Sequence, residues 1–400
     1  MYDLLRGLRI VEGAAFIAGP SCGLYFAQMG AEVVRFDAIG GGPDAKRWPL
    51  AENGASFYWE GLNKGKKSVA IDLGRPQGRE LAQRLATSGD GLFVTNYPVE
   101  GFLSYAKLAE RRKDLICLRV MGWADGTPAV DYTVNAAVGV PLMTGPADSQ
   151  APVNHVLPAW DLLTGAYGAF ALLAAERDRR TAGAGREIRL ALSDIAAATM
   201  GNLGQVAEVM AQNGDRPRSG NDLFGAFGRD FITRDGKRLM VVAITRRQWE
   251  KLLEILELGA AIAVVEAATG VFLAEDEGAR FIHRHRLNPL FETAFAARDS
   301  AVLAPLFDAA GVCWSRYQSL AEAVAGDARL FAGNEIFSAV AHPGGGTYPT
   351  PGCAARLPQD KRGAAAPSPR LGAHTDEVLA EWLGMSSREI GTLHDQGLVA

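Results

Sequence analysis

Asp161 is the carboxylate whose sequence surroundings best suit chemistry. It follows Pro158-Ala159-Trp160 at the start of a predicted helix, and no charged residue comes after it until Glu176. The free amides and the dipole of a helix N-terminus favour an anion, so we expect Asp161 to be ionised. An ionised carboxylate there can act as a nucleophile. It can also serve as the N-cap of the helix, and position alone leaves both roles open.

Ser21 is a second candidate nucleophile, within Gly19-Pro20-Ser21-Cys22-Gly23. This run matches the G-x-S-x-G pattern in which hydrolases place a serine between a strand and a helix. A hydrolase needs several strands before this turn, whereas one predicted strand precedes Ser21, and the adjacent proline hinders the strained turn. We therefore favour a small-residue loop entering a helix, and a hydrolase stays as an alternative.

Three other patterns are weaker. Asp37 ends a predicted strand, where dinucleotide enzymes hold ribose, but the G-x-G-x-x-G pattern is missing. His283 and His285 have no acidic or cysteine ligand at a helpful spacing, so no metal site is expected. The run 64–67, Lys-Gly-Lys-Lys, either receives a phosphate or forms a solvated turn.

Strands and helices alternate around these candidates. This order predicts an α/β fold with an open, largely parallel sheet. The predicted strands are 8–11, 31–36, 68–72, 91–94, 115–120 and 187–192, and the predicted helices are 20–29, 76–87, 161–180 and 193–212. The helix after Asp161 is rich in glycine and alanine, so another backbone can pack closely against it.

A composition shift over 213–221, NGDRPRSGN, predicts a domain boundary. We expect a linker and glycine-rich loop over 213–228, followed by a smaller α+β domain over 229–325. That domain begins with a hairpin, 229–244, turned by Asp235-Gly236. A stretch rich in glycine and proline, 342–369, then leads to a last helix, 375–383.

Composition and charge narrow the class of protein. The chain has 400 residues, of which 48% are hydrophobic and 22% charged, which suits two folded domains. The net charge of −4 comes from 41 basic and 45 acidic residues without a block of one sign, so we expect neither nucleic acid nor a membrane as partner. Four distant cysteines without a C-x-x-C pair fit a reducing compartment, and the N-terminus lacks a signal-peptide pattern, so a cytoplasmic protein is expected.

Several motifs together resemble the class III CoA-transferase family, of the formyl-CoA and carnitine CoA-transferase type. Their order and spacing span nearly the whole chain. The motifs are LRGLRIVE at 5–12, AGP at 18–20, GAEVVR at 30–35, NKGKKS at 63–68, TNY at 95–97 and LGAHTDEVL at 371–379. The resemblance implies an open Rossmann-like large domain built from segments 1–212 and 326–400, with the small domain between them, in an interlocked homodimer.

The same resemblance assigns roles to individual residues. It makes Asp161 the nucleophile and places Asp131 at an acidic position near it that helps to orient the reacting groups, although Asp131 can also be a loop cap. It implies contacts to CoA from residues at or near the carboxyl ends of strands: Ile17, Ala18, Ile71, Asp72, Asn96 and Tyr97. No cofactor is expected beyond the CoA moiety of the substrate.

Further stretches resemble a subgroup of this family that moves CoA between the C1 and C4 carboxylates of 2-methylfumarate (mesaconate). They are 40–49, 131–135, 154–161 and 225–231, whereas 98–101 and 222–229 depart from the formyl-CoA transferase pattern. This implies an acyl-CoA thioester and a dicarboxylic acid as partners. An intermolecular transferase acting on another dicarboxylic acid is the alternative, and a non-catalytic acyl-CoA-binding protein is a third.

Such chemistry needs a cation for the free carboxylate and protection from water. Arg47 and Arg229 are candidates for gripping that carboxylate, and a surface salt bridge is the other role open to each. The glycine-rich loop 225–228 is a candidate flap over the reactive intermediates.

Overall fold

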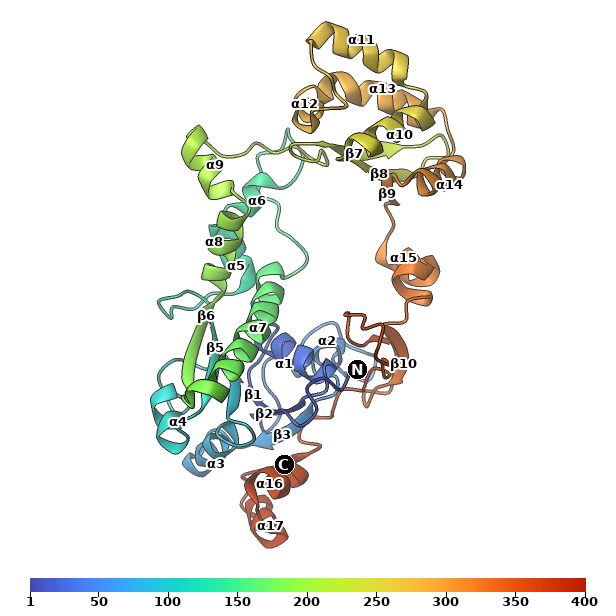
Figure 1. The fold of residues 1–400 in the computed structure, drawn as a ribbon. Coiled ribbons are helices and arrows are strands. Elements are labelled where there is room, and N and C mark those ends of the chain that lie inside the picture. Colours follow the sequence, from blue (N-terminus) through green and yellow to red (C-terminus); the bar gives the residue numbers. More distant parts are fainter. The chain divides into compact units, whose positions relative to one another are not determined.

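The computed structural model describes residues 1–400, which form two units (Figure 1). The first unit comprises Met1–Val138, His155–Glu208 and Ala328–Ala400, and the second comprises Gly139–Asn154 and Val209–Asp327. The expected division placed 139–154 with the N-terminal segment. It lies instead with the second unit, where the Arg218 guanidinium donates hydrogen bonds to the carbonyls of Leu142, Ser149 and Ala151.

A six-stranded sheet organises the first unit, with all neighbouring strands parallel. The strand order is β3-β2-β1-β4-β5-β6. The strands are β1 (Arg9–Gly13), β2 (Glu32–Ala38), β3 (Lys67–Ile71), β4 (Leu92–Thr95), β5 (Ile116–Met121) and β6 (Arg186–Ala191). These pairings confirm the predicted parallel sheet. Parallel pairing is possible because the segment between successive strands is long enough to cross over the sheet and hold a helix.

Alternate strand residues feed two cores, one on each face of the sheet. Ile10, Val33 and Leu92 face α1 (Ala18–Gln28) and α7 (Ala159–Ala182). Their neighbours Val11, Val34 and Phe93 belong to the opposite core with α3 (Pro76–Ala86), α16 (Thr375–Leu383) and α17 (Ser387–Asp395).

Helices α1 and α7 lie side by side on one face of the sheet (Figure 1). Small residues permit this approach, since a Cβ at Gly165 would collide with the Ser21 Oγ of α1. A Cβ at Gly168 would press on Leu118 of β5, so this glycine lets α7 lie close to the sheet. The glycine-rich face expected for α7 therefore packs against α1. This packing fixes the N-terminus of α7, which carries Asp161.

The remaining helices of the first unit are short. They are α2 (Phe57–Leu62), α4 (Tyr105–Arg111), α5 (Asp131–Ala137) and α8 (Leu192–Asn202), and α9 (Gln205–Gln212) begins in this unit. The single helix predicted over 193–212 is wrong: Gly204, at φ +77°, separates α8 from α9. A left-handed residue cannot continue a right-handed helix.

The C-terminal segment returns to the first unit beside β3. The Ala400 amide donates to the Ala70 carbonyl over 3.2 Å, and the Gly65 amide donates to the Pro367 carbonyl over 2.9 Å. A two-stranded antiparallel ribbon of β10 (Phe337–Ala341) and β11 (Thr347–Pro351) was not predicted, and its second strand lies within the glycine- and proline-rich stretch 342–369. The sequence did not indicate this ribbon because β11 contains two prolines, and proline within a strand is tolerated only at the edge of a sheet.

The second unit is built on an antiparallel sheet of order β7-β8-β9. Its strands are β7 (Phe227–Ile232), β8 (Arg238–Ala243) and β9 (Cys313–Arg316); its helices are α6 (Val140–Met143), α10 (Arg246–Leu256), α11 (Gly259–Thr269), α12 (Glu277–Ile282), α13 (Arg284–Ala296), α14 (Ser300–Ala310) and α15 (Leu320–Gly326). The predicted hairpin is present, with Gly236 in its turn at φ +72°. The glycine-rich loop is shorter than expected, because β7 already begins at Phe227, whose ring is buried in the core of this unit.

No helix in the structure combines the length and apolar character that crossing a membrane requires.

Candidate active site

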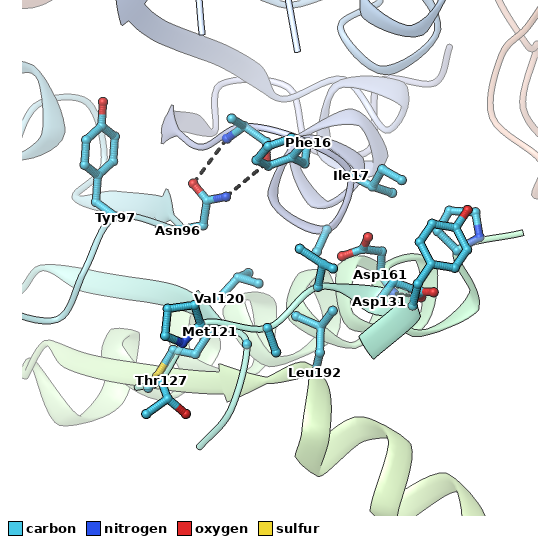
Figure 2. Close-up of a pocket in the computed structure, with 18 of the residues that line it drawn as sticks. Phe16, Ile17, Asn96, Tyr97, Val120, Met121, Thr127, Asp131, Asp161 and Leu192 are labelled. Carbon is cyan, nitrogen blue, oxygen red and sulfur yellow. Dashed lines mark hydrogen bonds between the residues drawn. The ribbon is translucent and has the colours of Figure 1, made fainter. Parts of the chain in front are cut away.

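The switch point of the sheet lies between β1 and β4, where open α/β sheets bind ligands. The loop after β1 and the loop after β4 are joined here by the Asn96 side chain. Its Nδ2 donates to the Ala15 carbonyl over 3.0 Å, and the Ala15 amide donates to its Oδ1 over 3.2 Å (Figure 2). Asn96 therefore fastens the two loops together at the ligand-binding edge.

A pocket of about 630 Å³ opens at this edge, entirely within the first unit. Asp131 and Asp161 lie next to each other at one end, and Asn96 and Tyr97 lie at the other (Figure 2). Among the lining residues are six candidates from the sequence, Ile17, Ala18, Asn96, Tyr97, Asp131 and Asp161, together with Arg47. A thioester and a carboxylate nucleophile can meet in a pocket of this size.

Asp131, from α5, caps the N-terminus of α7. Its Oδ2 accepts hydrogen bonds from the Trp160 amide over 2.7 Å and from the Asp161 amide over 3.1 Å. Asp131 is buried, and the first amides of a helix otherwise lack partners. The N-cap role that sequence left open for Asp161 thus falls to a residue of another helix.

The side chain of Asp161 accepts no hydrogen bond, and its pKa is raised to about 7. Burial is the main cause, the nearby Asp131 carboxylate adds to it, and Arg47 opposes it. The expectation of a fully ionised Asp161 is therefore wrong, because Asp131 takes the helix amides that were expected to stabilise the Asp161 anion. A carboxylate with a pKa near neutrality and no hydrogen bond to satisfy it is unusually basic and nucleophilic.

Arg47 supplies a positive charge without an acidic partner. Its guanidinium lies 5.6 Å from the ring centroid of Phe16 and 5.3 Å from that of Tyr58. The two rings hold the cation by cation–π contacts and leave its hydrogen-bonding edge free of carboxylates. Such a guanidinium suits a ligand carboxylate.

Two pocket residues carry no signal in the sequence. The Tyr58 hydroxyl is buried without a hydrogen-bond partner, and burial raises its pKa. Phe16 adopts φ +69°, and its amide donates to the Asp44 Oδ2 over 3.2 Å. A non-glycine residue in this conformation is strained, so Asp44 holds the loop in a shape it would otherwise leave.

Behind this loop lies a buried network of charges. Arg35 bonds Asp37 and Asp44, each within 2.9 Å, and Lys66 bonds both oxygens of Glu12. Asp37 is thereby committed to Arg35, so the structure gives no support to a ribose-binding role for it.

The basic run 64–67 is not a phosphate site. Lys66 is buried against Glu12, and Lys67 pairs with Glu32 and Glu377. Lys64 is buried as well, and this burial lowers its pKa to about 8. Both interpretations of this run, a phosphate site and a solvated turn, are therefore wrong, because its lysines are buried or paired with carboxylates.

Other candidates lie apart from the pocket. Ser21 is buried between α1 and α7, donates to the Ala18 carbonyl and bonds no histidine, so the hydrolase alternative finds no support. Ile71 is fully buried, and Asp72 caps the turn before α3 by accepting from the Gly74 amide and Arg75. Both stand at the end of β3, two strands away from the switch point.

Arg229 belongs to the second unit, on β7. Its guanidinium pairs with Asp222 and Glu292, at 3.7 Å and 3.3 Å. It thus has acidic partners already, unlike Arg47. In the same unit His283 and His285 flank the start of α13, and no group of three side chains suited to a metal ion is found in the structure.

The chain belongs to CoA-transferase family III, a family of enzymes, whose family model matches residues 5–375. Among curated relatives, 2-methylfumaryl-CoA isomerase of Chloroflexus aurantiacus is 48% identical over 404 residues, covering 100% of this chain and 98% of the relative. Succinyl-CoA:glutarate CoA-transferase of Mus musculus is 28% identical and covers 99% of this chain and 90% of the relative.

A solved structure confirms the fold. A CAIB/BAIF family protein from Brucella suis superposes with a TM-score of 0.75 at 24% identity, covering 95% of this chain and all of the other.

Proposed function

We propose that this enzyme is an intramolecular CoA transferase, which moves CoA between the C1 and C4 carboxylates of 2-methylfumarate. The full-length 48% identity to 2-methylfumaryl-CoA isomerase carries the choice of substrate. The chemistry is supported by the pocket, where Asp161 lies close enough to Arg47 for the cation to lower its pKa. A nucleophile and a carboxylate-binding cation in one pocket suit a substrate that is both a thioester and an acid.

The first half of the reaction makes an aspartyl thioester. An Asp161 oxygen attacks the C1 thioester carbonyl and expels CoA thiolate, which leaves a mixed anhydride between Asp161 and the acyl group. The thiolate then attacks the aspartyl carbonyl carbon. The anhydride C–O bond breaks, the C1 carboxylate is released, and CoA is held as a thioester of Asp161.

The second half reverses these steps at the other end of the acid. The C4 carboxylate attacks the aspartyl thioester, expels thiolate and forms a new anhydride. Thiolate attack at the C4 carbonyl yields the C4 thioester and regenerates the Asp161 carboxylate. The thioester energy is conserved throughout, so neither ATP nor a cofactor beyond CoA is required.

The pocket supports roles for the other residues. Ile17 and Ala18 form the N-terminus of α1, whose first amides have no partner within the helix, and Tyr97 lies at the far end of the pocket from Asp161. We expect CoA to extend along this path. Arg47 would hold the free carboxylate while the other end reacts.

We also infer a homodimer. Leu163, Tyr167 and Phe170 share one face of α7 and are 43%, 54% and 67% exposed. Apolar side chains at this spacing favour burial against another chain, and an interlocked pair would cover them. Sedimentation of the pure protein should give twice the mass of the chain. All four cysteines are free thiols, which fits the cytoplasm.

The decisive experiment incubates the pure enzyme with 2-methylfumaryl-CoA thioesterified at C1 and separates the regioisomers by chromatography. The C4 thioester should form without an added acid, and labelled free mesaconate should not enter the product. Dependence on added carboxylate, or label in the product at every turnover, would make the enzyme an intermolecular transferase.

The nucleophile is tested separately. Asp161→Asn should reduce turnover by at least about 10³-fold while leaving the circular-dichroism spectrum unchanged. Wild-type enzyme mixed with acyl-CoA and hydroxylamine should carry a hydroxamate at Asp161 in peptide mass spectra. A hydroxamate on another residue would refute the assignment.

A further inference from the structure

His155 lies four residues before α7 begins at Ala159, and its side chain contacts Asp131 of α5. The Nε2 atom lies 2.7 Å from the Asp131 Oδ1. The imidazole meets the Tyr132 ring edge-on, with centroids 5.7 Å apart, and lies tilted against Trp160. The side chain is 21% exposed. Its place is well defined, although the proposed chemistry gives it no task.

The two oxygens of Asp131 have different partners. Oδ2 accepts from the amides of Trp160 and Asp161, and Oδ1 contacts the His155 Nε2. Because Asp131 is 1% exposed, water cannot replace a lost donor at Oδ1. A buried carboxylate oxygen left without a donor is costly, so the His155 contact stabilises the Asp131 anion.

Building on the proposed role of Asp161 as nucleophile, we propose that His155 is a positioning residue that acts through Asp131. It holds the Asp131 carboxylate on the N-terminus of α7 and offsets its negative charge, and it thereby sets the ionisation and the orientation of the Asp161 side chain.

The sign of this effect follows from the charges around Asp161. Asp131 of α5 disfavours the Asp161 anion, and Arg47 from the loop after β2 favours it. Tyr58 of α2 and Tyr132 of α5 also face this side of the pocket, and burial raises the pKa of the Tyr58 hydroxyl, so Tyr58 stays neutral near pH 7. Because the Asp131 carboxylate can only accept, the His155 Nε2 carries the hydrogen in the neutral ring as well as in the cation. In either state this hydrogen bond partly offsets the negative charge of Asp131.

Removing His155 should therefore make Asp161 harder to ionise. We expect His155→Leu to raise the midpoint of Asp161 titration by at least about half a pH unit, because an unbalanced Asp131 anion remains beside it. His155→Gln, whose amide can still donate to Oδ1, should stay near the wild-type midpoint. Rescue by glutamine separates this role from simple packing.

The measurement needs no substrate. A water-soluble carbodiimide with a small amine modifies protonated carboxyl groups, and peptide mass spectrometry gives the labelling rate at Asp161 as a function of pH. The labelling rate does not depend on turnover. It therefore reports the Asp161 titration even if the enzyme does not carry out the proposed CoA transfer. In the active enzyme, kcat of His155→Leu should fall below wild type at pH 6 and approach it at pH 9.

A double-mutant cycle tests the route through Asp131. Asp131→Asn removes the charge that opposes Asp161, so the Asp161 midpoint should fall, and His155→Leu should then change nothing further. An unchanged midpoint in His155→Leu, or the same shift in the Asp131→Asn background, overturns the proposal. If His155→Leu does not fold, His155→Ser, which is too short to reach Oδ1, replaces it with the same expected shift.

Discussion

Two groups of charged side chains meet at the Phe16 loop of the first unit, and they are satisfied to very different degrees. In the buried network, Glu12, Arg35 and Lys66 all have an opposite charge within 4 Å. In the pocket, Arg47 has no carboxylate partner and the Asp161 side chain accepts no hydrogen bond. The two groups are adjacent, because Asp44 bonds Arg35 on one side and the Phe16 amide on the other.

The contrast separates charges that stabilise the fold from charges that await a ligand. A buried ion is tolerated when partners replace its hydration, as in the network. A buried charged group whose partners are missing, such as the Asp161 carboxylate, lowers the stability of the free protein, whereas the exposed Arg47 stays hydrated until a substrate carboxylate pairs with it. Substitutions in the network should therefore lower the free energy of unfolding. Substitutions in the pocket should instead weaken substrate binding or stabilise the free protein.

The largest effect on stability is expected in the network. Lys66→Met leaves the Glu12 carboxylate, which is fully buried, without its closest cation. Breaking one side of a buried pair costs about 3–5 kcal/mol, which should appear as a lower midpoint of urea unfolding. Lys251→Met, which removes an exposed pair with Glu254, is the control and should cost less than about 1 kcal/mol. Equal losses in the two variants would remove the distinction between network and surface.

An intermediate effect, on binding instead of stability, is expected at Arg47. Arg47→Met should raise KM for the C1 thioester by about 10–100-fold, since a charged hydrogen bond contributes about 1.5–3 kcal/mol, and should leave unfolding almost unchanged. Arg229→Met tests the other candidate cation and should raise KM much less, because Asp222 and Glu292 already engage it. A larger KM effect at Arg229 would transfer the carboxylate site to that residue.

Much of the pocket could be predicted from the sequence. The alternation of strands and helices fixes a parallel sheet, and parallel strands bring their carboxyl ends to one edge. This is why Ile17, Tyr97 and Asp131, far apart in the chain, line the same pocket as Asp161. The family motifs place the same residues because they preserve that arrangement.

The sequence could not reveal which carboxylate takes the amides of α7. Asp161 has the right position for an N-cap, but Asp131 receives those bonds from 29 and 30 residues away, because α5 packs against the start of α7. No local spacing encodes that contact. The Tyr58 hydroxyl and the left-handed Phe16 are likewise products of tertiary packing, and neither residue type signals its role.

The effect expected at Asp161 sharpens the comparison most, because its sign is opposite to that in the network. The pKa of Asp161 is about 7 in the fold and 3.8 as a free side chain, so between these values the folded state binds the proton more tightly. Its contribution to stability is therefore complete below about pH 4 and is lost as pH rises through about 7. Asp161→Asn cannot ionise, so its thermal midpoint should exceed that of wild type by much more at pH 8 than at pH 5, where only part of this contribution has been lost. Asp235 is the matched control, since hydrogen bonds from Ser300 and Thr233 lower its pKa and stabilise the folded state throughout this range. Asp235→Asn should lower the midpoint by the same amount at pH 5 and pH 8. If Asp161→Asn is also less stable than wild type at pH 8, the Asp161 anion is satisfied in the free protein, and the division between partnered and unpartnered charges does not hold.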